Sequence, residues 1–170
     1  MKAGVTDKNA RYRWRVKVET LVAYGGACAL CGERRPSCLT IDHPLGNGGE
    51  HRRELFGTQS AGYQFHLWLK RNDFPPGYRV LCFNCNIREY HKHRHYSPDQ
   101  GFRALRAKLE LHEAMGGCCQ QCGESDPDVL CVNGRDSTGR HGASLYYYLL
   151  RTGEYRNYSL RCYNCTRSDQ

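Results

Sequence analysis

The chain has 170 residues, a quarter of them charged, and a formal net charge of +8 at pH 7. This length is enough for two small domains but not for two large hydrophobic cores. Residues 1–8 contain no apolar core of a secretion signal, and no apolar run is long enough to span a membrane. These features exclude a membrane-embedded protein and lead us to expect a cytoplasmic one.

The positive charge lies in the first part of the chain. Residues 1–96 contain sixteen Lys or Arg and eight Asp or Glu, a net charge of +8, whereas residues 97–170 contain nine of each. A basic surface attracts phosphate backbones whatever their sequence. The uneven distribution favours a nucleic acid as the partner, although the total charge would also suit a basic protein without a specific partner.

Two long segments are predicted to be helices. Residues 11–18 alternate with a period of two, which is also typical of a strand. Their counterpart at 102–115 has helical spacing at Phe102, Leu105 and Leu109. A common register then gives the earlier segment one apolar stripe: Trp14, Val18, Leu21 and Val22. Glycine pairs at 25–26 and 116–117 are expected to end the two helices.

A pair of strands and a short helix are expected between these segments. Residues 39–42 and 78–81 are predicted to pair as strands, and a helix is predicted to begin at or near Asn86. The insertion between the strands begins with a glycine-rich sequence, 46–49, which predicts a flexible loop. Residues 63–71 then predict an amphipathic helix with an apolar side made of Phe65, Trp68 and Leu69.

Eight of the eleven cysteines form four CxxC pairs. Two such pairs can close a tetrahedral zinc site without other ligands, and this spacing favours zinc over disulfides or redox chemistry. The first predicted set is Cys28, Cys31, Cys82 and Cys85, and the second is Cys119, Cys122, Cys162 and Cys165. Three cysteines are left over and are expected to be small apolar residues: Cys38, Cys118 and Cys131. Cys118 could compete with its neighbour as a ligand.

The cysteine pairs belong to an internal repeat. The sequence at 25–33 recurs at 116–124, and the pattern at 78–85 recurs at 158–165. Agreement at several separated segments predicts a tandem duplication. We expect one domain at 1–96 and a second at 97–170.

Three polar residues of the first copy suit catalysis. Asp42 and His43 lie between the two CxxC pairs, and Asn86 directly follows the second pair. A zinc ion that joins the strand pair to the start of a helix would hold these three side chains near one another. A carboxylate, an imidazole and an amide carbonyl suit a hard divalent cation together with a general base.

The second copy lacks this set. The aligned residues are Asn133, Gly134 and Thr166, although all four zinc cysteines persist. The second copy is therefore expected to be a folded scaffold without an active site.

Four motifs of the first copy together resemble the HNH endonucleases of the ββα-metal class. They are Gly26-x-Cys28-x-x-Cys31-Gly32, Leu39-Thr40-Ile41-Asp42-His43, Gly48-Gly49-x-His51-Arg52 and Leu81-Cys82-x-x-Cys85-Asn86. In style they are similar to zinc-containing phage proteins, including homing nucleases and the recombination endonuclease VII group. Two features depart from the pattern: Gly77 stands where many members carry Asn, and the segment between His43 and Cys82 is long.

This resemblance implies an α+β fold in which a zinc-stabilised ββα unit, preceded by a helix, occurs twice. It implies that Asp42 and Asn86 bind one catalytic Mg²⁺ or Mn²⁺ ion and that His43 activates water. The products would carry 5′-phosphate and 3′-hydroxyl ends. It also suggests a bacterial or phage-infected cell as the setting.

Several basic residues are candidates for DNA contacts. Arg52, Arg53 and Arg88 are predicted to contact phosphate, although a solvated charged loop would have the same composition at 52–53. His51 could bind a phosphate, assist the metal ion or have a structural role. A tract of alternating histidines, His91, His93 and His95, suits either a basic junction between the copies or metal binding.

The sequence thus predicts a metal-dependent endonuclease acting on duplex or branched DNA, as a monomer that nicks or as a homodimer. The alternative is a non-catalytic zinc module that binds a nucleic acid or a protein. The sequence alone does not separate DNA from RNA as the target.

Overall fold

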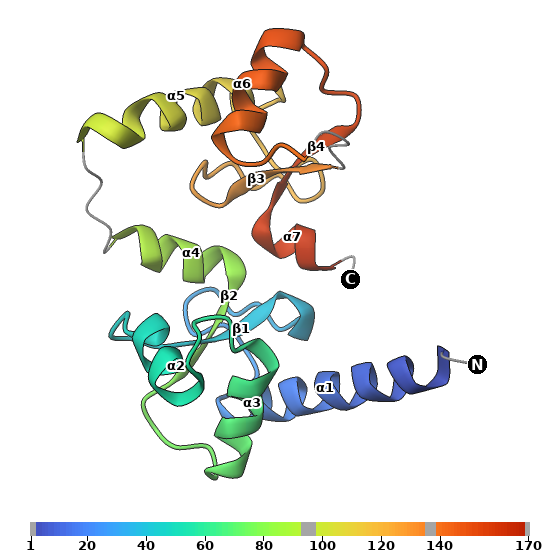
Figure 1. Cartoon of the computed structure of the whole chain (residues 1–170), viewed down its shortest axis with the longest axis vertical. Helices are drawn as coiled ribbons and strands as arrows, with labels where there is room; N and C mark the ends of the chain where they lie inside the picture. The colour runs from blue at the N-terminus through green and yellow to red at the C-terminus, as the bar shows by residue number, and fades with distance from the viewer. Residues whose placement is uncertain (1–2, 93–97, 135–138, 169–170) are drawn as a thin grey trace. The chain divides into compact units, whose positions relative to one another are not determined.

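The computed structural model describes residues 3–92, 98–134 and 139–168, and divides into two compact units, Met1–Asn86 and Ile87–Gln170 (Figure 1). The division falls earlier in the chain than the boundary predicted after residue 96. Helices and two small antiparallel sheets make up the described residues, so the predicted α+β class is confirmed. None of the described helices has the length and apolar character needed to cross a membrane.

The first unit is built around one strand pair. Its elements are α1 (Ala3–Ala23), the short 3-10 helix η1 (Pro36–Cys38), β1 (Leu39–Asp42), α2 (Gly48–Phe56), α3 (Gly62–Arg71), β2 (Arg79–Cys82) and α4 (Phe83–Lys92), which runs on into the second unit. The two strands are antiparallel, with Leu39 opposite Cys82 and Asp42 opposite Arg79. The observed strands lie within one residue of those predicted.

The buried side of α1 differs from the predicted apolar stripe. Val16, Thr20 and Leu21 are buried, whereas Trp14 and Val22 are 47% and 66% exposed. Thr20 can be buried because its hydroxyl donates a hydrogen bond to the carbonyl of Val16 within the helix, at 2.7 Å. The stripe prediction was right for Leu21 and wrong for Trp14 and Val22, because apolar spacing alone does not determine which face of a helix packs.

The insertion between the strands holds two helices rather than one. The predicted loop at 46–49 is replaced from Gly48 onward by α2, which ends at a left-handed Gly57 whose amide bonds to Arg53. The helix predicted at 63–71 is confirmed as α3. Phe65 and Leu69 point from α3 into the core of the first unit, and Trp68 packs at the edge of this core.

The second unit follows a similar order, but its described residues form one α-helix between the strands where the first unit has two. Its elements are α5 (Pro98–Ala114), β3 (Leu130–Gly134), α6 (Ala143–Thr152), β4 (Tyr158–Cys162) and α7 (Tyr163–Ser168). Its strand pair places Leu130 opposite Cys162, which matches Leu39 opposite Cys82 in the first unit.

Backbone details around the CxxC loops also agree between the units. The glycines at 25, 26 and 32 have φ values of 102°, 66° and 77°, and those at 116, 117 and 123 have 99°, 68° and 79°. The amide of Cys28 bonds to the carbonyl of Glu33 at 2.8 Å, and the amide of Cys119 bonds to that of Glu124 at 2.7 Å. Both loops therefore adopt one conformation.

Candidate metal centres and candidate active site

Two clusters of four cysteines are formed. In each cluster the four Sγ atoms all lie within 4.8 Å of one another. The Sγ atoms of Cys31 and Cys82 are 3.7 Å apart, as are those of Cys122 and Cys162. A tetrahedral site with Zn–S bonds of about 2.3 Å requires sulfur–sulfur distances of about 3.8 Å. The predicted cysteine sets are thus assembled, and their geometry suits one structural zinc ion each.

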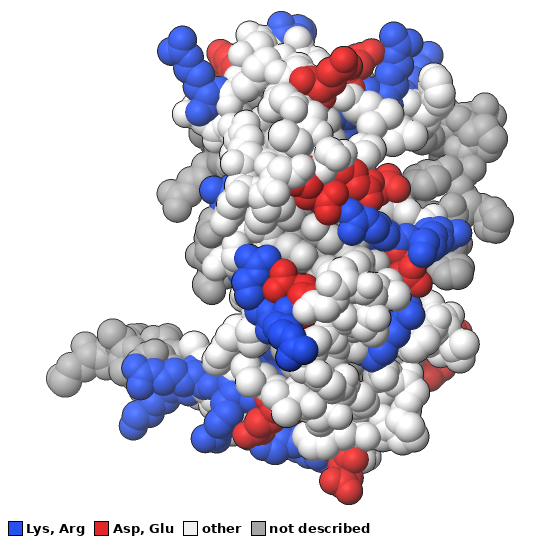
Figure 2. All heavy atoms as spheres, turned by 180° about the vertical axis from the view of Figure 1, so that it is seen from behind, with Lys and Arg blue, Asp and Glu red and all other residues white. Residues whose placement is uncertain are grey.

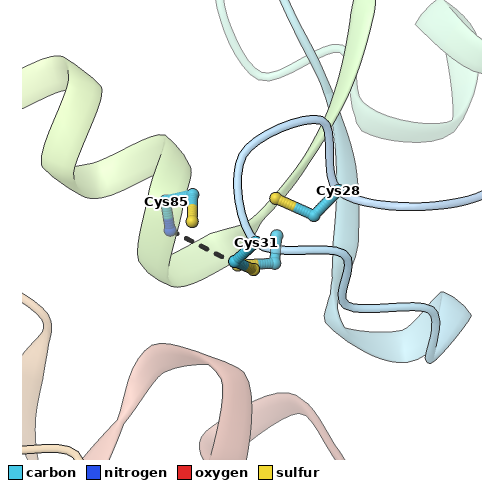
Figure 3. Close-up of side chains that lie close together, drawn as sticks. Cys28, Cys31 and Cys85 are labelled. Atoms are coloured by element: carbon cyan, nitrogen blue, oxygen red, sulfur yellow. Dashed lines mark hydrogen bonds between the residues drawn. The ribbon is translucent and has the colours of Figure 1, made fainter.

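Local hydrogen bonds shape the first cluster. The amide of Gly32 bonds to the carbonyl of Cys28 at 2.9 Å, in a turn that a left-handed φ of 77° permits without a side chain. On the other side, the amide of Cys85 donates to the sulfur of Cys82 at 3.4 Å. Figure 3 shows Cys28 and Cys31 on their loop facing Cys85 at the start of α4. The zinc site therefore joins the loop to the strand–helix junction.

The thiols of each cluster differ in acidity. Burial disfavours the Cys28 thiolate, but hydrogen bonds from three neighbouring backbone groups lower its pKa to about 7. The same balance lowers the pKa of Cys119 to about 6. Burial and the neighbouring cysteines raise the pKa of Cys85 and Cys165. One thiolate therefore forms readily in each cluster, and a bound cation would favour the thiolates of Cys85 and Cys165 as well.

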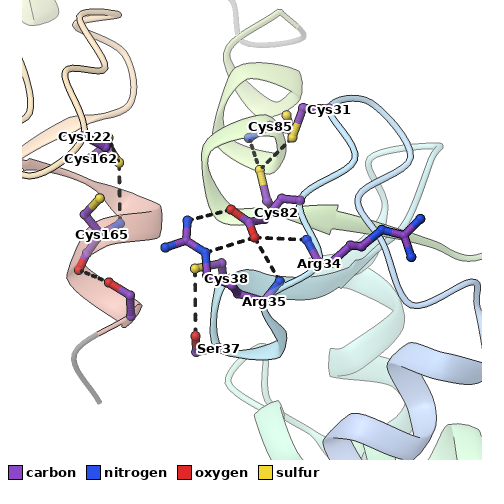
Figure 4. A network of polar contacts seen from close by, with 12 residues as sticks. Cys31, Arg34, Arg35, Ser37, Cys38, Cys82, Cys85, Cys122, Cys162 and Cys165 are labelled. Atoms are coloured by element: carbon purple, nitrogen blue, oxygen red, sulfur yellow. Dashed lines mark hydrogen bonds and ion pairs between the residues drawn. The ribbon is translucent and has the colours of Figure 1, made fainter.

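An ion pair braces the loop after the first CxxC pair. The Glu33 carboxylate accepts hydrogen bonds from the Arg35 side chain at 2.6 and 3.0 Å and from the amides of Arg34 and Arg35 (Figure 4). The hydrogen bond from the Arg35 side chain is the main reason that the pKa of Glu33 falls to about 2. The group stabilises the loop that presents the cysteines.

The three remaining cysteines lie outside both clusters. Cys38 is fully buried, while Cys118 and Cys131 are half-buried. The Cys131 thiol donates to the carbonyl of Arg161 at 3.3 Å. Cys119, and not Cys118, belongs to the second cluster, as the repeat predicts.

The structure brings Asp42 and Asn86 together. The amide of Asn86 donates to Oδ1 of Asp42 at 3.0 Å, and Nε of Arg79 donates to Oδ2 at 2.7 Å. The carboxylate and the amide are oxygen donors of the type that Mg²⁺ and Mn²⁺ prefer. Sequence reasoning missed Arg79, which the strand register places directly opposite Asp42.

His43 lies in an aromatic pocket next to this pair. Its ring is 8% exposed and stacks on Phe65 at 5.1 Å, with Tyr78 edge-on at 5.0 Å. Nε2 of His43 is 3.0 Å from Nδ1 of His51, a hydrogen bond in which one ring donates and the other accepts. His51 is thus a direct partner of the predicted base.

The pocket keeps His43 neutral. Burial, followed by the charges of Arg52 and His51, lowers its pKa to about 4, against a smaller opposing effect of Asp42. At neutral pH the imidazole therefore carries a lone pair, which is the form that a general base requires.

Gly48 allows this arrangement because α2 approaches His43 very closely. A Cβ atom at position 48 would lie 2.7 Å from Nδ1 of His43 and 3.1 Å from Nη1 of Arg52. Any side chain here would displace the ring or the guanidinium. This requirement depends on how α2 docks, so spacing in the sequence gave no signal for it.

The predicted DNA contacts have different environments. Arg53 is exposed, whereas Arg52 is half-buried and its Nε donates to the carbonyl of Gln59 at 2.8 Å. His51 packs against Trp68 inside the His43 pocket, with ring centroids 5.5 Å apart. These positions leave Arg53 as the most accessible of the three.

Arg88 does not suit a phosphate contact. Its Nε and Nη2 donate to Asp126 and Glu124 at 2.6 and 2.7 Å, both within the second unit. Despite the cost of burial, these carboxylates raise the pKa of Arg88. A guanidinium that is already paired with two carboxylates stabilises its own unit.

One residue of the predicted histidine tract lies in the described part of the chain: His91 packs against Tyr90, while positions 93 and 95 lie outside the described residues.

The aligned positions in the second unit have no comparable chemistry. A Cβ at Gly134 would lie 2.5 Å from the carbonyl oxygen of Asn157, so no side chain fits there. The hydroxyl of Thr166 donates to the carbonyl of Tyr163 at 2.8 Å.

Comparison with protein-family models, curated proteins and solved structures gives no match to this chain.

Proposed function

We propose that this protein is a metal-dependent HNH endonuclease that hydrolyses phosphodiester bonds in duplex or branched DNA. One observation carries the proposal: a buried, neutral His43 directly follows Asp42, whose carboxylate is hydrogen-bonded to Asn86 at 3.0 Å. The four-cysteine cluster fixes the register that brings these residues together from separate parts of the chain.

His43 would take a proton from the attacking water, because it is neutral at the pH of the cell. Its hydrogen bond to His51 would share the resulting positive charge between the two rings. Asp42 and Asn86 would hold one Mg²⁺ or Mn²⁺ ion, which when bound supplies charge stabilisation at the leaving oxygen. Arg52, which lies beside His43, would attract the phosphate to this pocket.

The second unit is proposed to be a degenerate copy of the first. The matched strand registers, glycine conformations and cysteine clusters support an origin by tandem duplication. Gly134 and Thr166 stand where a base and a metal ligand would be needed. Each chain would then have one active site and nick one strand, and cutting of both strands would need two chains.

A second function has support from one observation. Arg79 already occupies one oxygen of the Asp42 carboxylate, as it would in a zinc module that binds a nucleic acid without cutting it. The two functions differ in whether catalysis depends on a divalent ion and on His43.

Digestion of supercoiled plasmid with and without added Mg²⁺ tests the proposal. We expect nicked circles to form before linear DNA, and His43→Ala to lower the rate by about 10²–10⁴-fold, as expected for loss of a general base. Asn86→Ala should abolish cleavage while DNA affinity is kept. His141→Ala, an exposed histidine of the second unit, is the matched control. A His43→Ala variant that cuts as fast as the parent would show that the HNH assignment is wrong.

A further inference from the structure

The first helix extends beyond the rest of its unit. The N-terminal half of α1 projects away from β1, α2 and α3 (Figure 1). Residues 8–15 are all exposed, and full burial begins at Val16. The contacts of α1 with α3 begin at Tyr12 and Arg13, which lie 6.4 and 5.3 Å from the ring of Tyr63. Such a projecting helix needs a reason, because most of its exposed side chains gain little stability from packing.

Basic residues cover the projecting part. Lys8, Arg11 and Arg15 follow each other at i, i+3 and i+7, so they share one face of the helix over about 10 Å. This face points away from the buried side that carries Val16 and Thr20. No acidic residue occurs between positions 8 and 18. Figure 2 shows Lys and Arg side chains gathered along this helix.

Aromatic side chains lie between the cations. Tyr12 and Trp14 are 43% and 47% exposed. The Arg15 guanidinium lies 5.3 Å from the Tyr12 ring, and the Lys17 ammonium lies 5.5 Å from the Trp14 ring. Cation–π contacts of this kind hold the long basic side chains in place. The Arg15 guanidinium also lies 3.9 Å from the Glu19 carboxylate, but its side chain is 66% exposed, so the pair is weak, unlike the close double pairing of Arg88.

The distribution of these aromatics disfavours a membrane as the partner. Tyr12 and Trp14 are two residues apart, so they lie on nearly opposite sides of the helix. An interfacial membrane helix requires one continuous apolar face instead. Cations on the outer face with aromatics at both flanks suit a polyanion that the helix can lie against.

We propose that α1 is a DNA-binding arm, with Lys8, Arg11 and Arg15 contacting consecutive phosphates of a duplex. The choice of DNA rests on the proposed function. The arm adds a positively charged surface to the pocket of His43 in the same unit, and a major groove about 12 Å wide admits a helix. The contacts are to phosphate, so they add affinity without sequence preference.

The salt dependence of binding tests the arm. Affinity of a fluorescent DNA duplex is measured by anisotropy in buffer without added divalent ion, for the parent and for Lys8→Gln/Arg11→Gln/Arg15→Gln. Loss of three phosphate contacts lowers the salt slope by about 2.7, since each contributes about 0.9. Between 50 and 200 mM salt, the parent should then lose about 40-fold more affinity than the variant.

The control is a variant that removes the same number of positive charges from the second unit. Arg103→Gln/Arg106→Gln/Arg151→Gln removes three exposed arginines and should keep the slope of the parent. The arm is ruled out if its variant keeps the parent's slope, if the control loses as much, or if the parent binds no duplex. Tighter binding of an RNA duplex than of DNA would equally overturn the choice of partner.

Plasmid nicking in Mg²⁺ separates this proposal from the enzymatic one. If the parent loses salt-dependent DNA binding on substitution of α1 but never nicks plasmid, the binding arm is supported and the proposed endonuclease activity is contradicted. A parent that nicks, with an arm variant that binds and nicks equally well, would keep the endonuclease and remove the arm.

Discussion

Replacing Gly48 by alanine tests whether the position of the His43 ring governs activity. The added Cβ would lie 2.7 Å from Nδ1 and 3.1 Å from Cγ of His43. Unbonded heavy atoms are optimally about 3.5–4.0 Å apart, so the ring has to move by several tenths of an ångström or more. It has little room to retreat, because Phe65 stacks on it at 5.1 Å and Tyr78 meets it edge-on at 5.0 Å.

The expected effect is larger on rate than on stability. Overpacking of this kind costs about 1–3 kcal/mol, and the better helix propensity of alanine offsets up to about 1 kcal/mol. The net loss of about 0–3 kcal/mol should leave the zinc-bound protein folded. A displacement of about 1 Å in a catalytic group costs on the order of 10²-fold in rate, and complete loss of a general base sets a limit of about 10²–10⁴-fold.

The assay is single-turnover nicking of supercoiled plasmid, with urea unfolding of the same samples. Gly49→Ala is the matched control, because it lies in the same turn of α2 and the three atoms nearest to its Cβ would belong to Gln59, at an ordinary contact distance of 3.5–3.9 Å. It should nick like the parent. Parent-like nicking by Gly48→Ala would refute the reasoning, as would an equal loss of rate in Gly49→Ala.

Three further predictions concern metal, pH and the second unit. Metal analysis of protein purified without added metal should give two zinc ions per chain, and a ratio near one would mean that one cluster stays empty. Burial lowers the pKa of His43, His66 and His112 from 6.5 to about 4, so unfolding binds protons below pH 6.5. Stability should therefore be full above pH 6.5 and fall towards pH 4 in urea titrations. His112→Leu should weaken this pH dependence and stabilise the second unit by about 1–3 kcal/mol. The reason is that both ring nitrogens of His112 are buried without a hydrogen-bond partner among the described residues. Destabilisation by this substitution would show that the ring does have a hydrogen-bond partner in solution. Asn133→Asp/Gly134→His should lower the unfolding free energy without adding a nicking site, because the new Cβ would lie 2.5 Å from a backbone carbonyl.

The strands and cysteine clusters could be predicted because both depend on short spacings. Residues 39–42 form the strand as predicted, and the second strand is shifted by only one residue. Each CxxC pair needs only its own turn, a tetrahedral ion joins two pairs, and the internal repeat indicates which pairs belong together. The close approach of Asp42 and Asn86 follows from the same constraint, since Asn86 follows Cys85 in α4 and Asp42 ends the strand that pairs with β2, which carries Cys82.

Features that depend on tertiary packing could not be predicted in this way. The pair Gly48-Gly49 suggested a loop, but it begins α2. Position 48 is glycine because any side chain there would collide with His43, and not because the backbone has to form a loop. The outer stripe of α1 is the more apolar one by sequence, yet Thr20 is buried because its hydroxyl bonds within the helix. In both cases a contact that is distant in sequence, or one internal hydrogen bond, outweighs the local pattern.

The difference between the two units points to α2 as the element on which the chemistry depends. Both units have a four-cysteine cluster and the same strand register. Only the first has two helices between its strands, since the described residues between β3 and β4 form the single helix α6. Gly48, His51 and Arg52 all lie on α2, where they pack closely against His43, help to lower its pKa and provide its hydrogen-bond partner. A four-cysteine cluster thus accompanies the strand pair and the following helix in both units, whereas the environment of the proposed base depends on the inserted helix. Restoring a histidine to the second unit would supply the imidazole but not the pocket that makes it a base.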